Sequence, residues 1–131
     1  MNVESAMAAI EAGADAIVVS NHGGRVMDTM PGTAEVLPEI ANAVGGRAKV
    51  LVDGGIREGI DVLKMLALGA DAVLIGRPIC IAAFGAGQEG VEFYLNQLRE
   101  ELRKAMILTG NARVTQIEPS TIARNSKGEW R

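Results

Sequence analysis

A short pattern occurs twice in this chain and strongly restricts its fold. Gly-Ala-Asp-Ala stands at residues 13–16 and again at residues 69–72, and the two copies lead into apolar runs at residues 17–19 and 73–75. A third run of this kind occupies residues 50–52. Short, continuous, mostly β-branched runs are typical of parallel strands covered on both faces, and helical periodicity precedes each of them. The pattern predicts an α/β fold with about three parallel strands alternating with helices.

Apolar spacing and glycine stops predict the helices. One helix ends over residues 5–12 and another spans residues 59–68, and a glycine follows each of them. A third helix is expected after Thr33, where Val36, Leu37 and Ile40 have helical spacing. Pro38 would cost it a hydrogen bond unless the regular helix starts only near Val36. The longest, from about residue 90 to residue 108, has one apolar face and a glycine stop.

Polar, glycine-rich segments follow all three apolar runs, at residues 20–25, 53–55 and 76–78. The carboxyl ends of parallel strands lie on one side of a sheet, where α/β barrels keep their chemistry. The first segment holds His22, the only histidine, and Arg25. A base beside a guanidinium that binds a carboxylate at two points suggests an acid substrate that loses a proton. The structural alternative stays open: His22 caps the loop or bonds a carbonyl, and Arg25 is a surface charge.

Composition excludes several classes of function. The formal net charge of -3, with dispersed basic residues and few aromatic side chains, gives no nucleic-acid surface. We find no long apolar run for a membrane span and no secretion leader, so a cytoplasmic protein is expected. A metal site is not expected with one histidine and one cysteine. Cys80, alone after a strand, is expected to be a small core residue.

Three motifs carry a resemblance to a known family. Residues 20–28, residues 53–57 (Asp-Gly-Gly-Ile-Arg) and residues 76–78 (Gly-Arg-Pro) resemble, in order and spacing, the carboxy-terminal part of the FMN-dependent 2-hydroxy acid oxidases and dehydrogenases. Glycolate oxidase, lactate oxidase and flavocytochrome b2 belong to this family. Val26 and Met27 depart from the glutamine and leucine usual there.

The resemblance implies the carboxy-terminal part of a TIM (β/α)8 barrel over residues 1–118, followed by a polar, disordered tail at residues 119–131. It makes His22 the base that takes a proton from a small (S)-2-hydroxy acid, and Arg25 the group that binds the substrate carboxylate. The product is the 2-oxo acid. It assigns FMN binding to these residues: Ser20, Asp53, Gly54, Gly55, Arg57, Gly76 and Arg77. Barrels of this kind often bind phosphate at the loops after the last two strands. Surface salt bridges, for example to Glu58, are the alternative for the two arginines.

The sequence indicates only three strands in 131 residues, whereas a complete barrel has eight strands and needs about 250 residues. The resemblance makes them the sixth to eighth strands and assigns a lysine, tyrosines and the aspartate partner of His22 to the missing front. The chain alone is therefore expected to be inactive, and to form a homo-oligomer or associate with an amino-terminal half. Two alternatives remain: a catalytically silent FMN-phosphate-binding or assembly module, and another type of FMN barrel, against which the pair His22 and Arg25 argues.

Overall fold

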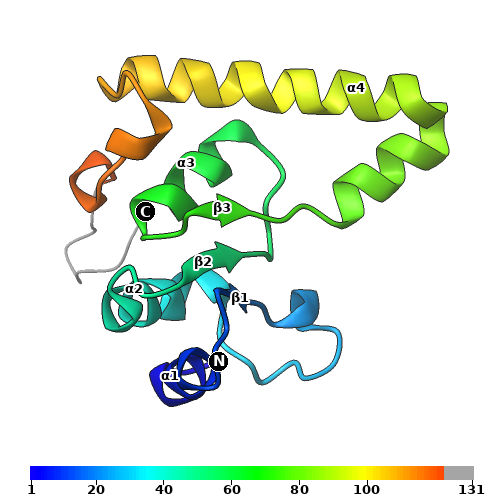
Figure 1. The fold of residues 1–131 in the computed structure, drawn as a ribbon. Helices are drawn as coiled ribbons and strands as arrows, with labels where there is room; N and C mark the ends of the chain where they lie inside the picture. Colours follow the sequence, from blue (N-terminus) through cyan, green and yellow to red (C-terminus); the bar gives the residue numbers. More distant parts are fainter. Residues whose placement is uncertain (123–131) are drawn as a thin grey trace.

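The computed structural model describes residues 1–122, in which helices and strands alternate (Figure 1). The helices are α1 (Val3–Glu11), α2 (Thr33–Val44), α3 (Gly59–Ala67) and α4 (Arg77–Leu108), and the strands are β1 (Ala16–Val19), β2 (Lys49–Val52) and β3 (Ala72–Val73). Short 3₁₀ turns lie at His22–Gly24, Val114–Gln116 and Pro119–Thr121. None of the helices in this described part is long and apolar enough to cross a membrane.

The three strands form one parallel sheet in the order β1-β2-β3, as the repeated pattern predicts. Ile17 pairs with Val50, and Val52 pairs with Val73. The third strand is shorter than expected, because regular pairing stops at Val73. The Leu74 N–H still donates to the Val52 carbonyl at 2.8 Å before the chain turns away.

The helices pack against one face of the sheet, which holds the buried side chains of Val19, Val50 and Val52. The opposite face is partly exposed, and Val18 on it is 52% exposed. α1 packs against α2, and α3 packs against α4. The largest fully buried side chains come from helices and from the central strand: Leu37, Val44, Val52 and Leu63. Burying a leucine of this kind contributes roughly 1.5–3 kcal/mol. The core therefore holds the sheet rigidly and fixes the strand ends from which the loops emerge.

The starts of the first two helices are defined by the structure. α1 begins at Val3, where the Asn2 side chain caps it by accepting the Ser5 N–H at 2.9 Å. α2 begins at Thr33, in agreement with the predicted helix after this residue, and not only near Val36, so Pro38 lies inside the helix. The proline leaves α2 one backbone hydrogen bond short. Burial of one apolar face of the helix, including Leu37, compensates for this loss.

The last predicted helix, from about residue 90 to residue 108, corresponds to the second segment of a longer helical region. α4 begins at Arg77 and has two segments, which meet at Ala86 and Gly87. Gly87 adopts φ +56° and ψ −136°, a conformation restricted essentially to glycine. A side chain at Gly90 would collide with the Ala82 carbonyl, so the turn is tightly packed. The two segments form the corner at the right of Figure 1.

The first part of the expected tail contacts the folded part of the chain. Pro119–Thr121 forms a 3₁₀ turn, and Ile122 packs against buried hydrophobic residues of the core. The remainder of the expected tail, residues 123–131, lies outside the described residues. The domain boundary at residue 118 stays a prediction.

Candidate functional site

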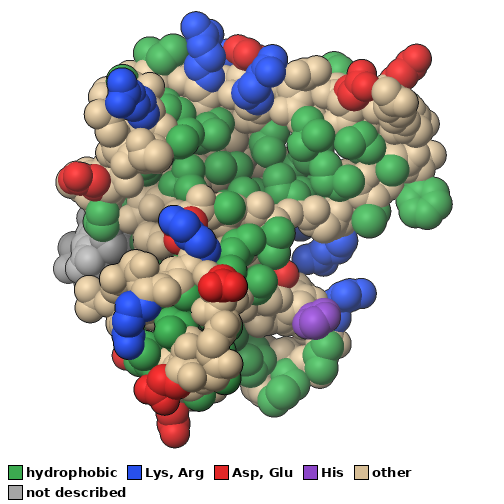
Figure 2. Space-filling model, viewed as in Figure 1, with side chains coloured by type: hydrophobic (Ala, Val, Ile, Leu, Met, Phe, Trp, Pro, Cys, Tyr) green, Lys and Arg blue, Asp and Glu red, His purple; other side chains and the backbone are tan. Residues whose placement is uncertain are grey.

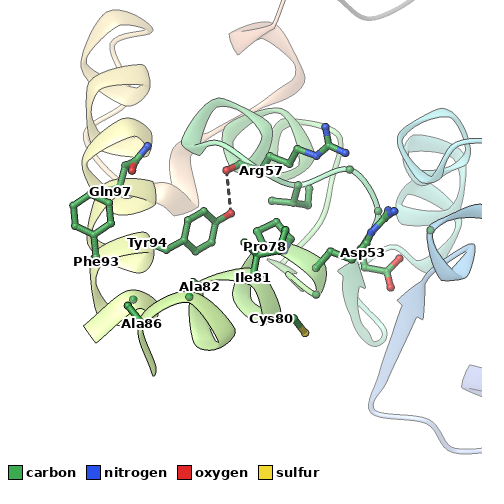
Figure 3. A pocket seen from close by; sticks show the side chains of 18 of the residues that line it. Asp53, Arg57, Pro78, Cys80, Ile81, Ala82, Ala86, Phe93, Tyr94 and Gln97 are labelled. Carbon is green, nitrogen blue, oxygen red and sulfur yellow. Dashed lines mark hydrogen bonds between the residues drawn. The ribbon is translucent and has the colours of Figure 1, made fainter. Parts of the chain in front are cut away.

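The three predicted loops meet at the carboxyl ends of the strands and line one pocket of about 890 Å³ (Figure 3). Predicted site residues in its wall are His22, Arg25, Asp53, Gly54, Gly55, Arg57, Gly76 and Arg77. Ser20, the remaining predicted residue, lies behind this wall and contacts Asp53. The structure therefore brings together residues that are up to 57 positions apart between Ser20 and Arg77.

Hydrogen bonds hold the loop after β1 in one shape. The Ser20 hydroxyl donates to Asp53 Oδ2 at 2.7 Å and accepts the His22 N–H at 3.2 Å. The Asn21 side chain accepts the Gly23 N–H at 3.0 Å. These bonds keep His22 at φ +56°, a left-handed conformation that is uncommon for any residue except glycine. Such strain persists only where the surroundings impose it, and it gathers at functional sites.

Asp53 lines the pocket, and its hydrogen bonds leave one oxygen free. Its carbonyl accepts the hydroxyl of the buried Thr33 at 2.6 Å, and its Oδ2 is bonded to Ser20. Its Oδ1 is buried and has no hydrogen-bond partner. An unsatisfied buried acceptor costs about 1–3 kcal/mol, so this oxygen is suited to a ligand hydroxyl or N–H donor. Sequence reasoning missed Thr33, for which the only signal was its place at the start of α2.

Glycines leave space beside this carboxylate. Gly54 and Gly55 have φ values of +92° and +77°, which a residue with a side chain adopts only with strain. A Cβ on Gly54 would lie 2.9 Å from the Thr33 hydroxyl, so this turn is closely packed on one side. On Gly55 or Gly76 a Cβ would meet nothing within 4 Å. The backbone on that side is open to a ligand.

Arg57 and Arg77 supply positive charge to the pocket. Both side chains belong to exposed residues, and neither forms an ion pair within residues 1–122. The alternative of a salt bridge to Glu58 is therefore not realised in this part of the chain. The Arg77 guanidinium lies close to Gly23, where an added Cβ would be 3.0 Å from it. Arg77 thus reaches from the start of α4 to the loop that carries His22.

The start of α3 is already occupied by carboxylates. Asp61 accepts the N–H groups of Arg57 and Glu58 at 3.0 and 3.1 Å, and Glu101 of α4 accepts the Gly59 N–H at 2.9 Å. A helix N-terminus attracts anions, but these donors are used by the protein itself. The N–H groups at the start of α3 are therefore not available to an anionic ligand.

The second wall of the pocket comes from the corner in α4, which the sequence did not reveal. It is largely apolar, and Ile81, Ala82, Phe93, Tyr94 and Gln97 are among its residues. Pro78 near the start of α4 was the available signal, since proline is common in the first turn of a helix. Cys80 lies in the same wall and is exposed, so the prediction of a core cysteine is wrong.

The fold and the site together define a class of protein. Parallel strands with covering helices carry a pocket at their carboxyl ends, and this pocket combines two arginines, strained loops and an unsatisfied carboxylate oxygen. This is the arrangement of an α/β barrel that binds an anionic ligand. A sequence model of the FMN-dependent dehydrogenases matches residues 1–124, and the chain belongs to this family.

Individual relatives agree with this membership. The chain is 51% identical over 124 residues to an L-lactate dehydrogenase of Xanthomonas campestris pv. campestris (strain B100). The matched region covers 95% of this chain and 32% of that protein. It is 50% identical to an L-lactate dehydrogenase of Xanthomonas euvesicatoria pv. vesicatoria (strain 85-10) over the same length. The chain spans about a third of the length of these relatives.

Solved structures show the same likeness. A mandelate oxidase bound to 3,3-difluoro-2-hydroxy-3-phenylpropionic acid matches with a TM-score of 0.87 and 54% identity, over 89% of this chain and 35% of that one. A mandelate oxidase bound to benzoyl-formic acid matches with a TM-score of 0.85 and 55% identity, over 87% of this chain and 34% of that one. The predicted family and the predicted fold, part of a (β/α)8 barrel, are confirmed.

Proposed function

We propose that this chain provides the base, the carboxylate-binding arginine and the FMN phosphate site of an enzyme that oxidises a small (S)-2-hydroxy acid to the 2-oxo acid. The observation that carries the proposal is the convergence of His22, Arg25, Asp53 and Arg77 on one pocket. Because the chain spans about a third of its relatives' length, the activity belongs to a polypeptide assembly that includes the remaining strands.

The residues present fit FMN. The unsatisfied Asp53 Oδ1 is an acceptor for a hydroxyl of the ribityl chain, and Ser20 holds the other oxygen of this carboxylate in place. The open backbone at Gly55 and Gly76 gives the chain of the cofactor room. Arg57 and Arg77 face the same space and match a phosphate monoester with close to two negative charges. FMN supplies the acceptor for the two electrons that leave the substrate.

Arg25 and His22 are proposed to act on the substrate. Arg25 Nε donates to the His22 carbonyl at 3.3 Å, which fixes the side chain near the histidine and leaves the terminal N–H groups for a carboxylate. A carboxylate held at two points places the α-carbon and its hydroxyl within reach of the His22 imidazole. His22 then takes a proton, either from the α-carbon or from the hydroxyl, as the substrate loses two electrons.

The names of the relatives support the substrate class. Lactate carries a methyl group on its α-carbon and mandelate carries a phenyl group, and both are 2-hydroxy acids. What they share is the carboxylate and the α-hydroxyl, which are the groups assigned to Arg25 and His22. We propose this shared class of substrate, whatever its side chain.

A second candidate is a module that binds the FMN phosphate or another chain without catalysis. Its support is the surface outside the pocket, where Phe84 is 95% exposed and Leu108 is 86% exposed. Figure 2 shows hydrophobic side chains gathered on the face below α4. Exposed apolar patches of this kind mark interaction surfaces, and the missing barrel strands or a second copy would cover them. Both candidates predict assembly, but only the first predicts reduction of FMN by substrate.

The test is anaerobic reduction of FMN bound to the full-length protein. Lactate and mandelate, added separately, should bleach the flavin absorbance, and propionate, which lacks the hydroxyl, should not. His22→Gln should keep FMN bound and slow the bleaching by about 10²- to 10⁴-fold, the usual contribution of a general base. Bleaching of the His22→Gln protein at the parent rate would leave His22 a structural residue. A parent protein that binds FMN but is reduced by no 2-hydroxy acid would favour the module.

A further inference from the structure

The loop between β2 and α3, residues 53–59, is tied to the distant helix α4 by two hydrogen bonds. The Tyr94 hydroxyl donates to the Arg57 carbonyl at 3.0 Å, as the dashed line in Figure 3 shows. The Gly59 N–H donates to Glu101 Oε2 at 2.9 Å. Neither bond takes part in the chemistry proposed above. Both join α4 to the segment that contains an arginine of the proposed phosphate site.

Two hydrogen bonds hold the backbone of Arg57, one on each side of the residue. Its N–H donates at 3.0 Å to Asp61 Oδ2, the carboxylate that also forms the capping box of α3 with Glu58, and its carbonyl accepts the Tyr94 hydroxyl. With both peptide groups held, the direction in which the Arg57 side chain leaves the backbone is set. The guanidinium has no ion pair within residues 1–122 that would compete with a ligand, so the fixed backbone restricts the space that its charge can reach.

The contact between α4 and the loop is close. A Cβ on Gly59 would collide with the backbone of Leu102, so α4 lies directly against the start of α3. Tyr94 remains a donor at neutral pH, because burial and the negative charges of Glu101 and Asp61 raise the pKa of its hydroxyl above the usual value. Gln97, which lies between the two contacts along α4, donates to Glu101 Oε1 at 2.9 Å and steadies this carboxylate.

We propose that Tyr94 is a positioning residue for cofactor binding, which holds the Arg57 carbonyl and thereby directs the Arg57 guanidinium toward the phosphate of FMN. Glu101 supports the same loop through the Gly59 N–H. The proposal rests on the assignment of Arg57 to the FMN phosphate. It gives the second segment of α4 a role at the site that neither its sequence nor its distance from Arg57 along the chain indicates.

The test is a double-mutant cycle measured by flavin fluorescence titration of the full-length apoprotein. Tyr94→Phe keeps the ring and removes the hydroxyl, so FMN affinity should fall about two- to tenfold, the value of one neutral hydrogen bond. The affinity for riboflavin, which has no phosphate, should not change. In an Arg57→Ala protein the further change Tyr94→Phe should have no effect, because the group that it directs is gone. Gln88→Ala, which removes an exposed hydrogen bond to Glu92 on the same helix, is the matched control.

Each other outcome contradicts the proposal in a distinct way. Equal losses for FMN and riboflavin, or the same loss with and without Arg57, would make Tyr94 a general structural residue. Unfolding of the Tyr94→Phe protein, seen by circular dichroism, would do the same. A parent protein that binds FMN no better than riboflavin would remove the phosphate site and the proposed function with it. A parent that prefers FMN and an inert Tyr94→Phe change would remove only the role of Tyr94.

Discussion

Charged side chains at the amino end of the sheet have partners within the protein, whereas several at the carboxyl end have none within the described residues. At the amino end, Lys49 Nζ lies 2.7 Å from Asp71 Oδ1, and Asp71 Oδ2 accepts the Val50 N–H at 2.9 Å. At the carboxyl end, Asp53 has a buried oxygen without a partner, and Arg57 and Arg77 form no ion pair within the described part of the chain. The protein itself pairs the charged groups at the amino end, and it leaves charged groups at the carboxyl end available to a ligand.

This difference separates stability from function. In barrels the amino end of the strands serves the fold, whereas the carboxyl end carries the ligand site. Asp71 and Asp53 are the same residue type beside neighbouring strands, yet Asp71 joins β2 to β3 and Asp53 keeps one acceptor free. The cost of the free acceptor and of the strained His22 is tolerated because the core and the amino end hold the sheet in place.

The largest expected effect on FMN affinity comes from removing a positive charge at the carboxyl end of the strands. Arg77→Ala should weaken FMN binding about ten- to a hundredfold, the value of a charge-assisted hydrogen bond, and should leave riboflavin binding nearly unchanged. Arg47→Ala is the matched change near the amino end, where Arg47 donates to the Ala43 and Val44 carbonyls at the end of α2. It should lower stability slightly and leave FMN affinity unaltered. Flavin fluorescence titration checks both, and equal FMN losses in the two variants would abolish the contrast between the two ends.

Two glycines at similar dihedral angles make the contrast more specific. Gly13 near the amino end has φ +97°, and Gly54 at the carboxyl end has φ +92°. An alanine at either position adopts a strained left-handed conformation, which costs about 1–3 kcal/mol. At Gly13 the new methyl group meets open space, whereas at Gly54 it lies 2.9 Å from the Thr33 hydroxyl.

Gly54→Ala should therefore lower the free energy of unfolding by at least about 1 kcal/mol more than Gly13→Ala does. It should also weaken FMN binding, because Thr33 holds the Asp53 carbonyl. Urea unfolding and flavin titration of the two variants measure these effects. Identical losses of stability would mean that the turn after β2 can relax.

The smallest effect is expected from the ion pair at the amino end. Hydrogen bonds from Lys49 and from the Val50 N–H hold the pKa of Asp71 below its ordinary value of 3.8. A lowered folded-state pKa stabilises the fold above the unfolded pKa, and this stabilisation disappears as the pH falls through the folded value. Because both side chains are well exposed, Asp71→Asn should cost less than about 1 kcal/mol at pH 7.

The difference between the parent and Asp71→Asn should shrink as the pH falls below about 4, as measured by urea unfolding across pH. Glu100→Gln is the control, because Glu100 lies 3.7 and 3.9 Å from two exposed arginines on α4 and makes no other ion pair within residues 1–122. It should have a smaller effect at every pH. A parent advantage that grows in acid would contradict the role given to Asp71.

Features encoded by adjacent residues were predictable. The repeated Gly-Ala-Asp-Ala pattern and the β-branched runs indicated the parallel strands, and glycine-rich segments after them indicated the loops that line the pocket. α3 lies where the glycine stop and the apolar spacing predict it. Helix starts were less predictable. Pro38 left the start of α2 open between Thr33 and Val36. The helix begins at Thr33, and burial of Leu37 and Val44 outweighs the loss of one hydrogen bond.

Contacts between distant segments were not predictable from the sequence. The corner at Gly87 depends on close packing of Gly90 against Ala82, and it places Tyr94 on the wall of the pocket. Cys80 is exposed because the first segment of α4 faces this pocket and not the core.

Short motifs and their spacing were enough to specify the parallel α/β class, the family and the residue types at the strand ends. Which polar groups find partners depends on the folded chain. Asp53 and Asp71 look alike in the sequence, and Tyr94 carries no motif. Ser20 binds one oxygen of Asp53, and the other oxygen of this carboxylate stays unsatisfied. Lys49 pairs with Asp71, and the Arg57 carbonyl accepts the Tyr94 hydroxyl. Hydrogen bonds act over about 3 Å, and folding alone sets distances on this scale between residues far apart in the chain.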